Sequence, residues 1–122
     1  MNHKLEGGSV TLREIKYKLT LNIRTAKKHL NEEVTGGYAA DLLSDVMANA
    51  KKGNIWITVQ SHPNIVAVAS LLELSAIVVT GGKKIEKETL SRAEREDITI
   101  FDTTYSTFNI VGKLYKMGVI GG

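Results

Sequence analysis

Cysteine is absent from the 122 residues, which excludes disulfide bonds, thiolate metal sites and cysteine nucleophiles. Proline occurs once, and no apolar run approaches the roughly 18 residues that a membrane-spanning helix needs. The start, Met1-Asn2-His3-Lys4, opens no apolar signal segment, so we expect a cytoplasmic protein that meets no membrane. Basic residues exceed acidic residues by only three, a surplus too small to indicate nucleic acid as a partner.

The chain has enough apolar residues for one globular core, since its hydrophobic content is 43%. Residues 1–9 end in Gly7-Gly8-Ser9 and carry no apolar periodicity, so we interpret them as a cloning remnant or disordered leader. We expect a single domain over residues 10–118 and a short tail over residues 119–122.

Apolar spacing alternates between strands and helices from Val34 onward. Near-continuous apolar runs predict buried strands at 55–59, 76–80 and 98–102. Helical spacing predicts helices at 42–50, capped by Asp41, and at 64–74, 87–97 and 107–117. In the last helix, the side that carries Phe108, Val111, Leu114 and Tyr115 is expected to be apolar.

Two further elements precede this alternation. Thr11 and Glu14 have the spacing of a capping box for a short helix, and alternation over residues 19–24 predicts an edge strand. The whole order predicts an α/β protein with three layers, α/β/α, around a mainly parallel central sheet.

One segment of the sequence resembles another. Val34-Thr35-Gly36-Gly37 matches Val79-Thr80-Gly81-Gly82, and at the same shift Asn64-Ile65-Val66 matches Asn109-Ile110-Val111. Either a duplicated strand–helix unit or repeated use of the same turn chemistry explains the match. Both Thr-Gly-Gly sequences are predicted to be turns in which glycine adopts a positive φ.

The motifs of phosphate transfer and metal catalysis are missing. Gly82-Lys83 and Gly112-Lys113 lack the first glycine and the hydroxyl of a P-loop, and the three histidines are scattered. We therefore predict no catalytic residue, no metal site and no cofactor.

Polar residues follow the predicted strands, at positions that open helices. Since the carboxyl ends of parallel strands meet at one sheet edge, a ligand crevice is expected there, although helix capping explains the same residues. The candidate ligand-binding residues are Thr35, Gly36, Gly37, Ser61, His62, Asn64, Thr80, Gly81, Gly82, Thr103 and Thr104.

The helix predicted at 64–74 is apolar around its whole circumference, which is typical of a helix buried on every side. We predict a homodimer through Ile65, Val68 and Leu72, while coverage by the first or last helix of the same chain is the alternative.

The run from Glu33 through Val34-Thr35-Gly36-Gly37-Tyr38 to Met47, together with Trp56-Ile57-Thr58 and His62-Pro63-Asn64, resembles the DRTGG domain family over roughly residues 10–118. Asn31 and Glu32 stand where that family tends to have Asp-Arg, so no role of that arginine is transferred. The resemblance implies a fold like the amino-terminal domain of HPr kinase/phosphorylase. It also implies an accessory role. Related domains accompany CBS domains in regulatory pyrophosphatases, and others lie beside phosphotransacetylase domains.

From the resemblance and the missing motifs we expect a non-catalytic regulatory or scaffolding module. It would bind a protein partner or a small anionic ligand, such as a nucleotide or a phosphorylated metabolite. The alternative is a small enzyme that acts on a phosphorylated metabolite at a crevice formed by Ser61, His62 and Thr103.

Overall fold

The computed structural model describes residues 9–121, so the predicted leader lies outside the described residues except for Ser9. A five-stranded sheet has the order β2-β7-β6-β5-β4. Its strands are β2 (Asn22–Ile23), β4 (Gly36–Ala39), β5 (Asn54–Thr58), β6 (Ala76–Val79) and β7 (Ile100–Asp102). Strands β4 to β7 are parallel, and β2 pairs antiparallel with β7 at one edge. The predicted mainly parallel sheet is confirmed.

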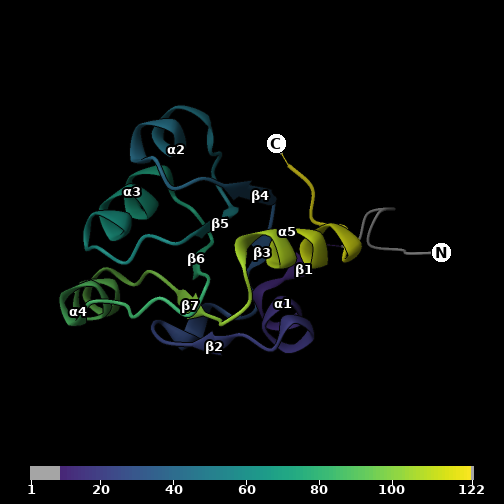
Figure 1. Ribbon diagram of the computed structural model, residues 1–122, viewed down its shortest axis with the longest axis horizontal. Helices are drawn as coiled ribbons and strands as arrows, with labels where there is room; N and C mark the ends of the chain where they lie inside the picture. Colours follow the sequence, from purple (N-terminus) through teal and green to yellow (C-terminus); the bar gives the residue numbers. More distant parts are fainter. Residues whose placement is uncertain (1–8, 122) are drawn as a thin grey trace.

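Helices cover both faces of the sheet, as Figure 1 shows. The connections between successive parallel strands form α2 (Leu43–Asn49), α3 (Asn64–Leu72) and α4 (Lys87–Glu96), which lie on one face. The other face is covered by α1 (Leu12–Leu19) and α5 (Thr107–Lys116). A short helical turn, η2 (Lys27–His29), and a two-stranded pair of β1 (Val10–Thr11) with β3 (Glu33–Val34) complete the described elements. The three-layer prediction is confirmed.

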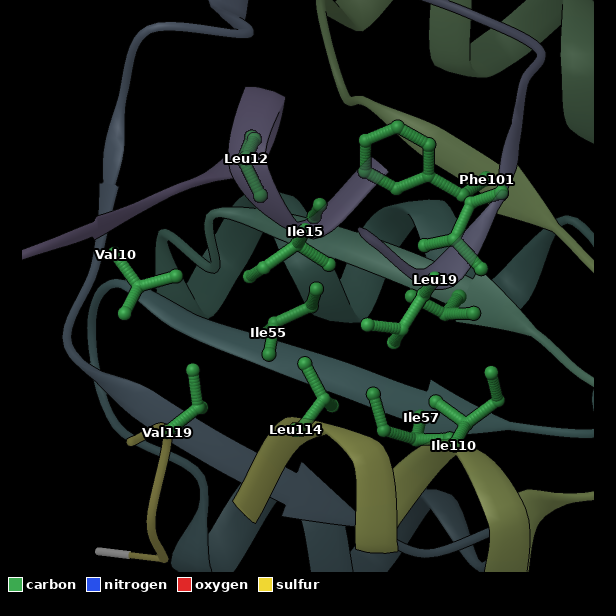
Figure 2. Close-up of a cluster of buried hydrophobic side chains, with 13 residues drawn as sticks. Val10, Leu12, Ile15, Leu19, Ile55, Ile57, Phe101, Ile110, Leu114 and Val119 are labelled. Atoms are coloured by element: carbon green, nitrogen blue, oxygen red, sulfur yellow. The ribbon is translucent and has the colours of Figure 1, made fainter. Parts of the chain in front are cut away.

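The central strands are buried on both sides because successive side chains point to opposite faces. In β5, Ile55 and Ile57 pack with α1 and α5, whereas Trp56 packs with the opposite helices, and all three are almost fully buried. Figure 2 shows the first of these clusters, in which side chains from α1 and α5 converge on β5 and on Phe101 of β7.

The predicted start of α1 is confirmed, because the Thr11 hydroxyl accepts from the Glu14 amide and the Glu14 carboxylate accepts from the Thr11 amide. The predicted strand over 19–24 is shorter than expected. Leu19 still belongs to α1, and Thr20 ends that helix in a left-handed conformation before β2 begins.

Asp41 does not cap α2. Its carboxylate accepts hydrogen bonds from the Thr58 hydroxyl at 2.8 Å and from the Val59 amide at 2.9 Å, so it ties the ends of β4 and β5 together. The prediction of which residues form the apolar side of α5 is also partly wrong. Ile110 and Leu114 face the core, while Phe108 is 86% exposed and Tyr115 is 58% exposed.

Helix α3 is buried by its neighbours in the same chain. It lies between α2 and α4, whereas the sequence suggested the first or last helix as its cover. Ile65 and Val68 are buried, so the premise that they form an exposed face is wrong. Leu72 is half-buried, and the neighbouring Leu71 is 67% exposed.

None of the helices in the described range 9–121 has the length and apolar character that a bilayer crossing requires.

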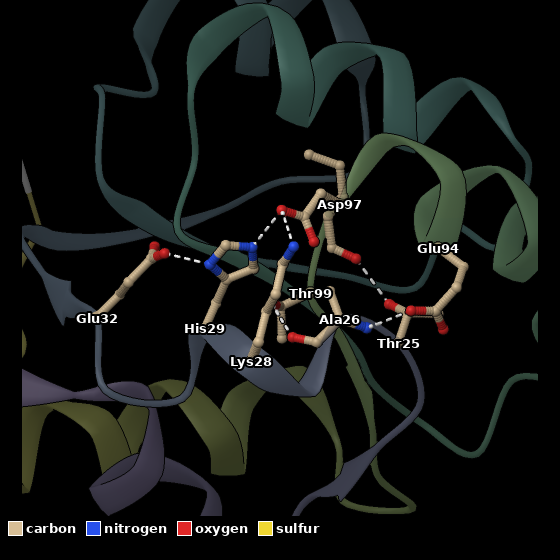
Figure 3. Close-up of polar contacts among 9 residues, drawn as sticks. Thr25, Ala26, Lys28, His29, Glu32, Glu94, Asp97 and Thr99 are labelled. Carbon is tan, nitrogen blue, oxygen red and sulfur yellow. Dashed lines mark hydrogen bonds and ion pairs between the residues drawn. The ribbon is translucent and has the colours of Figure 1, made fainter.

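A polar cluster holds the segment before β3 against the α4–β7 connection (Figure 3). The two ring nitrogens of His29 face two carboxylates: Nδ1 faces Glu32, and Nε2 lies 2.6 Å from Asp97. Lys28 also approaches Asp97, at 3.4 Å. Nearby, the Thr25 hydroxyl donates to the Ile98 carbonyl. A ring with a carboxylate on each nitrogen makes both hydrogen bonds only when it is doubly protonated.

Burial disfavours the charged ring, but the hydrogen bond to Asp97 and the charge of Glu32 outweigh burial and raise the pKa of His29 above 6.5. The hydrogen bond with His29 in turn lowers the pKa of Asp97 below its ordinary 3.8. The clamp formed by His29, Glu32 and Asp97 is therefore complete in mildly acidic solution.

Replacing Leu114 by alanine is expected to lower the free energy of unfolding by about 2–5 kcal/mol, because it leaves a cavity under α5. The matched variant Phe108→Ala removes a larger but exposed side chain. It should change the free energy of unfolding by less than about 0.5 kcal/mol. Urea unfolding of both variants measures the difference. Equal losses would contradict the described orientation of α5.

The folded protein should lose stability as the pH rises above about 6.5, since a raised pKa in the folded state stabilises only while the ring is protonated. His29→Gln should flatten the dependence of the melting temperature on pH between about 6 and 8. His62→Gln is the control, because its ring faces a backbone amide rather than a carboxylate. An unchanged pH dependence in His29→Gln would contradict the clamp.

Candidate functional site

The carboxyl ends of the parallel strands lie at one edge of the sheet, as they do in every open α/β sheet. At this edge the β6–α4 connection begins with Thr80-Gly81-Gly82, and the β7–α5 connection begins with Thr103-Thr104. Backbone hydrogen bonds join them: the Gly81 amide donates to the Tyr105 carbonyl at 2.7 Å and the Gly82 amide to the Thr103 carbonyl at 2.9 Å. The structure therefore brings these five predicted residues together.

A pocket of about 230 Å³ opens beside these two connections. We call it the strand-end pocket, and its lining residues are Asn22, Gly82, Lys83, Asp102, Thr103 and Thr104. Asp102 accepts from Asn22 Nδ2 at 3.0 Å and pairs with Arg24 Nη1 at 2.5 Å, so its negative charge is already matched. Lys83 is exposed and adds a positive charge to the rim.

Several of the predicted hydroxyls are used inside the fold. Thr80 Oγ1 lies 2.6 Å from Thr107 Oγ1, and the Thr103 hydroxyl accepts from the Tyr105 amide. Ser106 caps α5 by accepting from the Asn109 amide. Among the described residues no buried polar side-chain atom lacks a partner. These hydroxyls thus have partners within the fold, with Ser106 as a helix cap and Thr80 and Thr103 in other contacts, and the exposed Thr104 is left at the pocket.

Ser61, His62 and Asn64 lie elsewhere on the same edge. They follow β5, which β6 separates from β7, and they open α3 on the face opposite α5. His62 Nδ1 accepts from the Asn64 amide, and the Ser61 carbonyl accepts from the Thr89 hydroxyl of α4. The lining of the strand-end pocket includes Thr103 but neither Ser61 nor His62, so this pocket is not the predicted crevice of Ser61, His62 and Thr103.

Thr35, Gly36 and Gly37 lie at the opposite, amino edge. Gly36 and Gly37 belong to strand β4 and have no positive φ, so their prediction as a turn is wrong. Gly81 and Gly82 do adopt positive φ values, of 74° and 68°. The two matching Thr-Gly-Gly sequences therefore have different structures. Thr35 and Gly36 border a separate hollow, whose lining includes the acidic residue Glu33 and no basic residue.

Sequence reasoning missed Asn22, Lys83 and Asp102 as pocket residues. Asn22 belongs to the edge strand β2, whose pairing with β7 places Asn22 opposite Asp102. Lys83 directly follows a strand and the Gly81-Gly82 turn, and this position is the sequence signal that could have identified it. In the described part of the chain no group of three histidine or carboxylate side chains is arranged to hold a metal ion.

The sequence profile of the DRTGG domain family matches residues 19–117. The chain belongs to the DRTGG domain family. No curated protein matches it. Among solved structures, it is similar to the crystal structure of the CBS and DRTGG domains of the regulatory region of Clostridium perfringens pyrophosphatase, complexed with the activator diadenosine tetraphosphate.

The TM-score with that structure is 0.74 at 20% sequence identity, which shows a shared fold. The similarity covers 96% of this chain and 51% of the other, so this chain spans about half of the clostridial one. A DRTGG domain thus occurs there beside CBS domains in a regulatory region that binds a nucleotide activator.

The two Thr-Gly-Gly sequences of this DRTGG domain should respond oppositely to alanine. Gly81→Ala is expected to lower the free energy of unfolding by about 1–2 kcal/mol, because an L-residue is strained at that φ. Gly37→Ala should raise it by up to about 1 kcal/mol, since its new Cβ would lie 3.6 Å from Val119 in ordinary contact. Denaturant unfolding measures both. Losses of similar size would contradict the assignment of Gly37 to a strand.

Proposed function

We propose that this DRTGG domain is a non-catalytic regulatory module that binds a small anionic ligand, a nucleotide or phosphorylated metabolite, at the strand-end pocket. The observation that carries the proposal is the convergence of Lys83 and Thr104 from two separate connections on one pocket. Pockets at the carboxyl ends of parallel strands are where open α/β sheets usually bind their ligands.

The charges around the pocket support an anion rather than a cation. Arg24 offsets Asp102, which leaves the positive charge of Lys83 uncompensated by any ion pair within residues 9–121. A volume of about 230 Å³ is below the ~300 Å³ of a typical drug-sized site. The pocket therefore suits a phosphate or ribose portion, with the rest of the ligand reaching over the exposed Gly82 and Thr104.

A regulatory role is supported by the clostridial pyrophosphatase, whose regulatory region carries a DRTGG domain. That region also contains CBS domains, so the ligand class proposed for this chain rests on its own pocket. The absence of a P-loop pattern from the sequence supports a non-catalytic module.

A homodimer is a further part of the proposal. Leu71 and Leu72 are the large apolar residues of α3 with exposed surface, at 67% exposure for Leu71. They would form the contact in place of the buried Ile65 and Val68.

The proposed ligand class is tested by thermal unfolding with inorganic phosphate, AMP, ATP and diadenosine tetraphosphate. At a hundred times its dissociation constant a ligand adds about 2.7 kcal/mol, which raises the melting temperature of a domain this size by several degrees. Lys83→Met should abolish the increase.

Lys84→Met is the matched control, since it removes the same charge from the next residue, which lies outside the pocket lining. If no compound raises the melting temperature, or if both variants respond like the original protein, the proposed site is wrong.

A further inference from the structure

The positive charge of this protein is concentrated on the face formed by α1 and α5. These helices carry five of the 16 basic residues (Arg13, Lys16, Lys18, Lys113 and Lys116) and one of the 13 acidic residues, Glu14. The rest of the chain therefore has one more acidic than basic residue. Helices α2, α3 and α4 on the opposite face carry three basic and four acidic residues.

None of these five cations forms an ion pair within residues 9–121. Arg13 donates to the neutral side chain of Asn31, and Lys113 lies 5.0 Å from the centre of the Tyr105 ring. All except the half-buried Lys16 are exposed. Their charge is therefore available to a partner.

Exposed aromatic side chains gather on the same face. Tyr17 of α1 is 86% exposed, and Phe108 and Tyr115 of α5 are 86% and 58% exposed. Tyr105, in the turn before α5, is 42% exposed. The other aromatic residues are buried or half-buried. Aromatic residues are enriched in protein interfaces, so these exposed rings favour a protein partner for this face.

An apolar groove runs along the other side of α5, between that helix and the edge strand β4. Its volume is about 160 Å³, and it is lined by Gly37, Ala39, Ile57, Val111, Leu114 and Tyr115, together with Val119 and Ile120 of the C-terminal segment. Gly37 has no side chain and Ala39 has only a methyl group, so neither fills it. Helix α5 lies between β4 and α1 in Figure 1, so the groove is on the side of α5 away from α1.

We propose that the α1–α5 face docks an acidic segment of a partner protein that inserts aliphatic side chains into the groove. Charge complementarity indicates that the partner segment is negatively charged, because the four surplus cations attract carboxylates. The groove indicates the class of partner, because its apolar lining, aliphatic apart from Tyr38 and Tyr115, accepts a leucine or isoleucine side chain and contains no cation for a nucleic-acid backbone. Phe108 and Tyr115, two helical turns apart on α5, flank the inserted residues.

The test uses the full chain and a fluorescent peptide with leucine at i, i+3, i+4 and i+7 and glutamate elsewhere. Fluorescence polarisation should show saturable binding that weakens with salt. The same peptide with lysine for glutamate should not bind. Lys113→Glu with Lys116→Glu takes the net charge of the two helices from +4 to 0 and should abolish the preference for the glutamate peptide.

Lys51→Glu with Lys52→Glu is the matched control, because it makes the same charge change on the exposed turn before β5. It should alter binding of the glutamate peptide far less. Phe108→Ala with Tyr115→Ala should weaken binding by about tenfold or more. Thermal unfolding confirms that each variant is folded.

Three results would overturn the proposal. The first is no binding of the glutamate peptide, and the second is an equal loss in both charge-reversal variants, which would indicate net charge alone. The third is tighter binding of a single-stranded oligonucleotide that the α5 variants abolish, which would assign the face to nucleic acid.

Discussion

The structure depends on a parallel sheet whose two faces are both apolar and must both be covered. Right-handed connections between successive parallel strands place their helices on one face, which accounts for α2, α3 and α4. The other face receives no helix from these connections. It is covered by α1 and α5, which come from the beginning and the end of the described chain. Leu12, Ile15 and Leu19 of α1 and Ile110 and Leu114 of α5 fill that side of the core.

This division has a consequence for the surfaces of the molecule. Helix α5 leaves the last strand and returns across the sheet towards β4, where the Gly37 amide donates to the Ile120 carbonyl. Two helices on one face cover less than three on the other, so a groove is left beside β4. The same strand order places the connections after β6 and β7 side by side, which forms the strand-end pocket.

Much of the fold was predictable because local chemistry and tertiary packing agree. The runs around Trp56 and Ile77 are apolar enough to be buried strands in any arrangement, and Thr11 with Glu14 gives α1 a start that its own residues determine. Family membership, the α/β layers and the parallel sheet follow from such signals.

The predictions that fail concern residues whose chemistry suits two structural roles. The tertiary structure determines which of the two roles each residue has. Asp41 suits a helix cap, but the end of β5 offers its carboxylate two donors, so it binds Thr58 and Val59 instead. Gly36-Gly37 and Gly81-Gly82 both follow a strand and a threonine, yet the first pair continues as strand β4 and the second pair forms a turn. The spacing of Phe108 and Tyr115 predicts that they belong to the core, and their exposure follows only once the position of α5 is known.

The proposed function depends on the binding of an anion at the strand-end pocket. Two-dimensional amide NMR of the labelled protein, titrated with ATP and with inorganic phosphate, tests it residue by residue. Binding at this pocket predicts saturable shifts that centre on the amides of Gly82, Lys83, Thr103 and Thr104. Shifts that centre instead on Thr35 and Gly36 at the amino edge, or on Ser61 and His62 before α3, would contradict it, as would an unchanged spectrum.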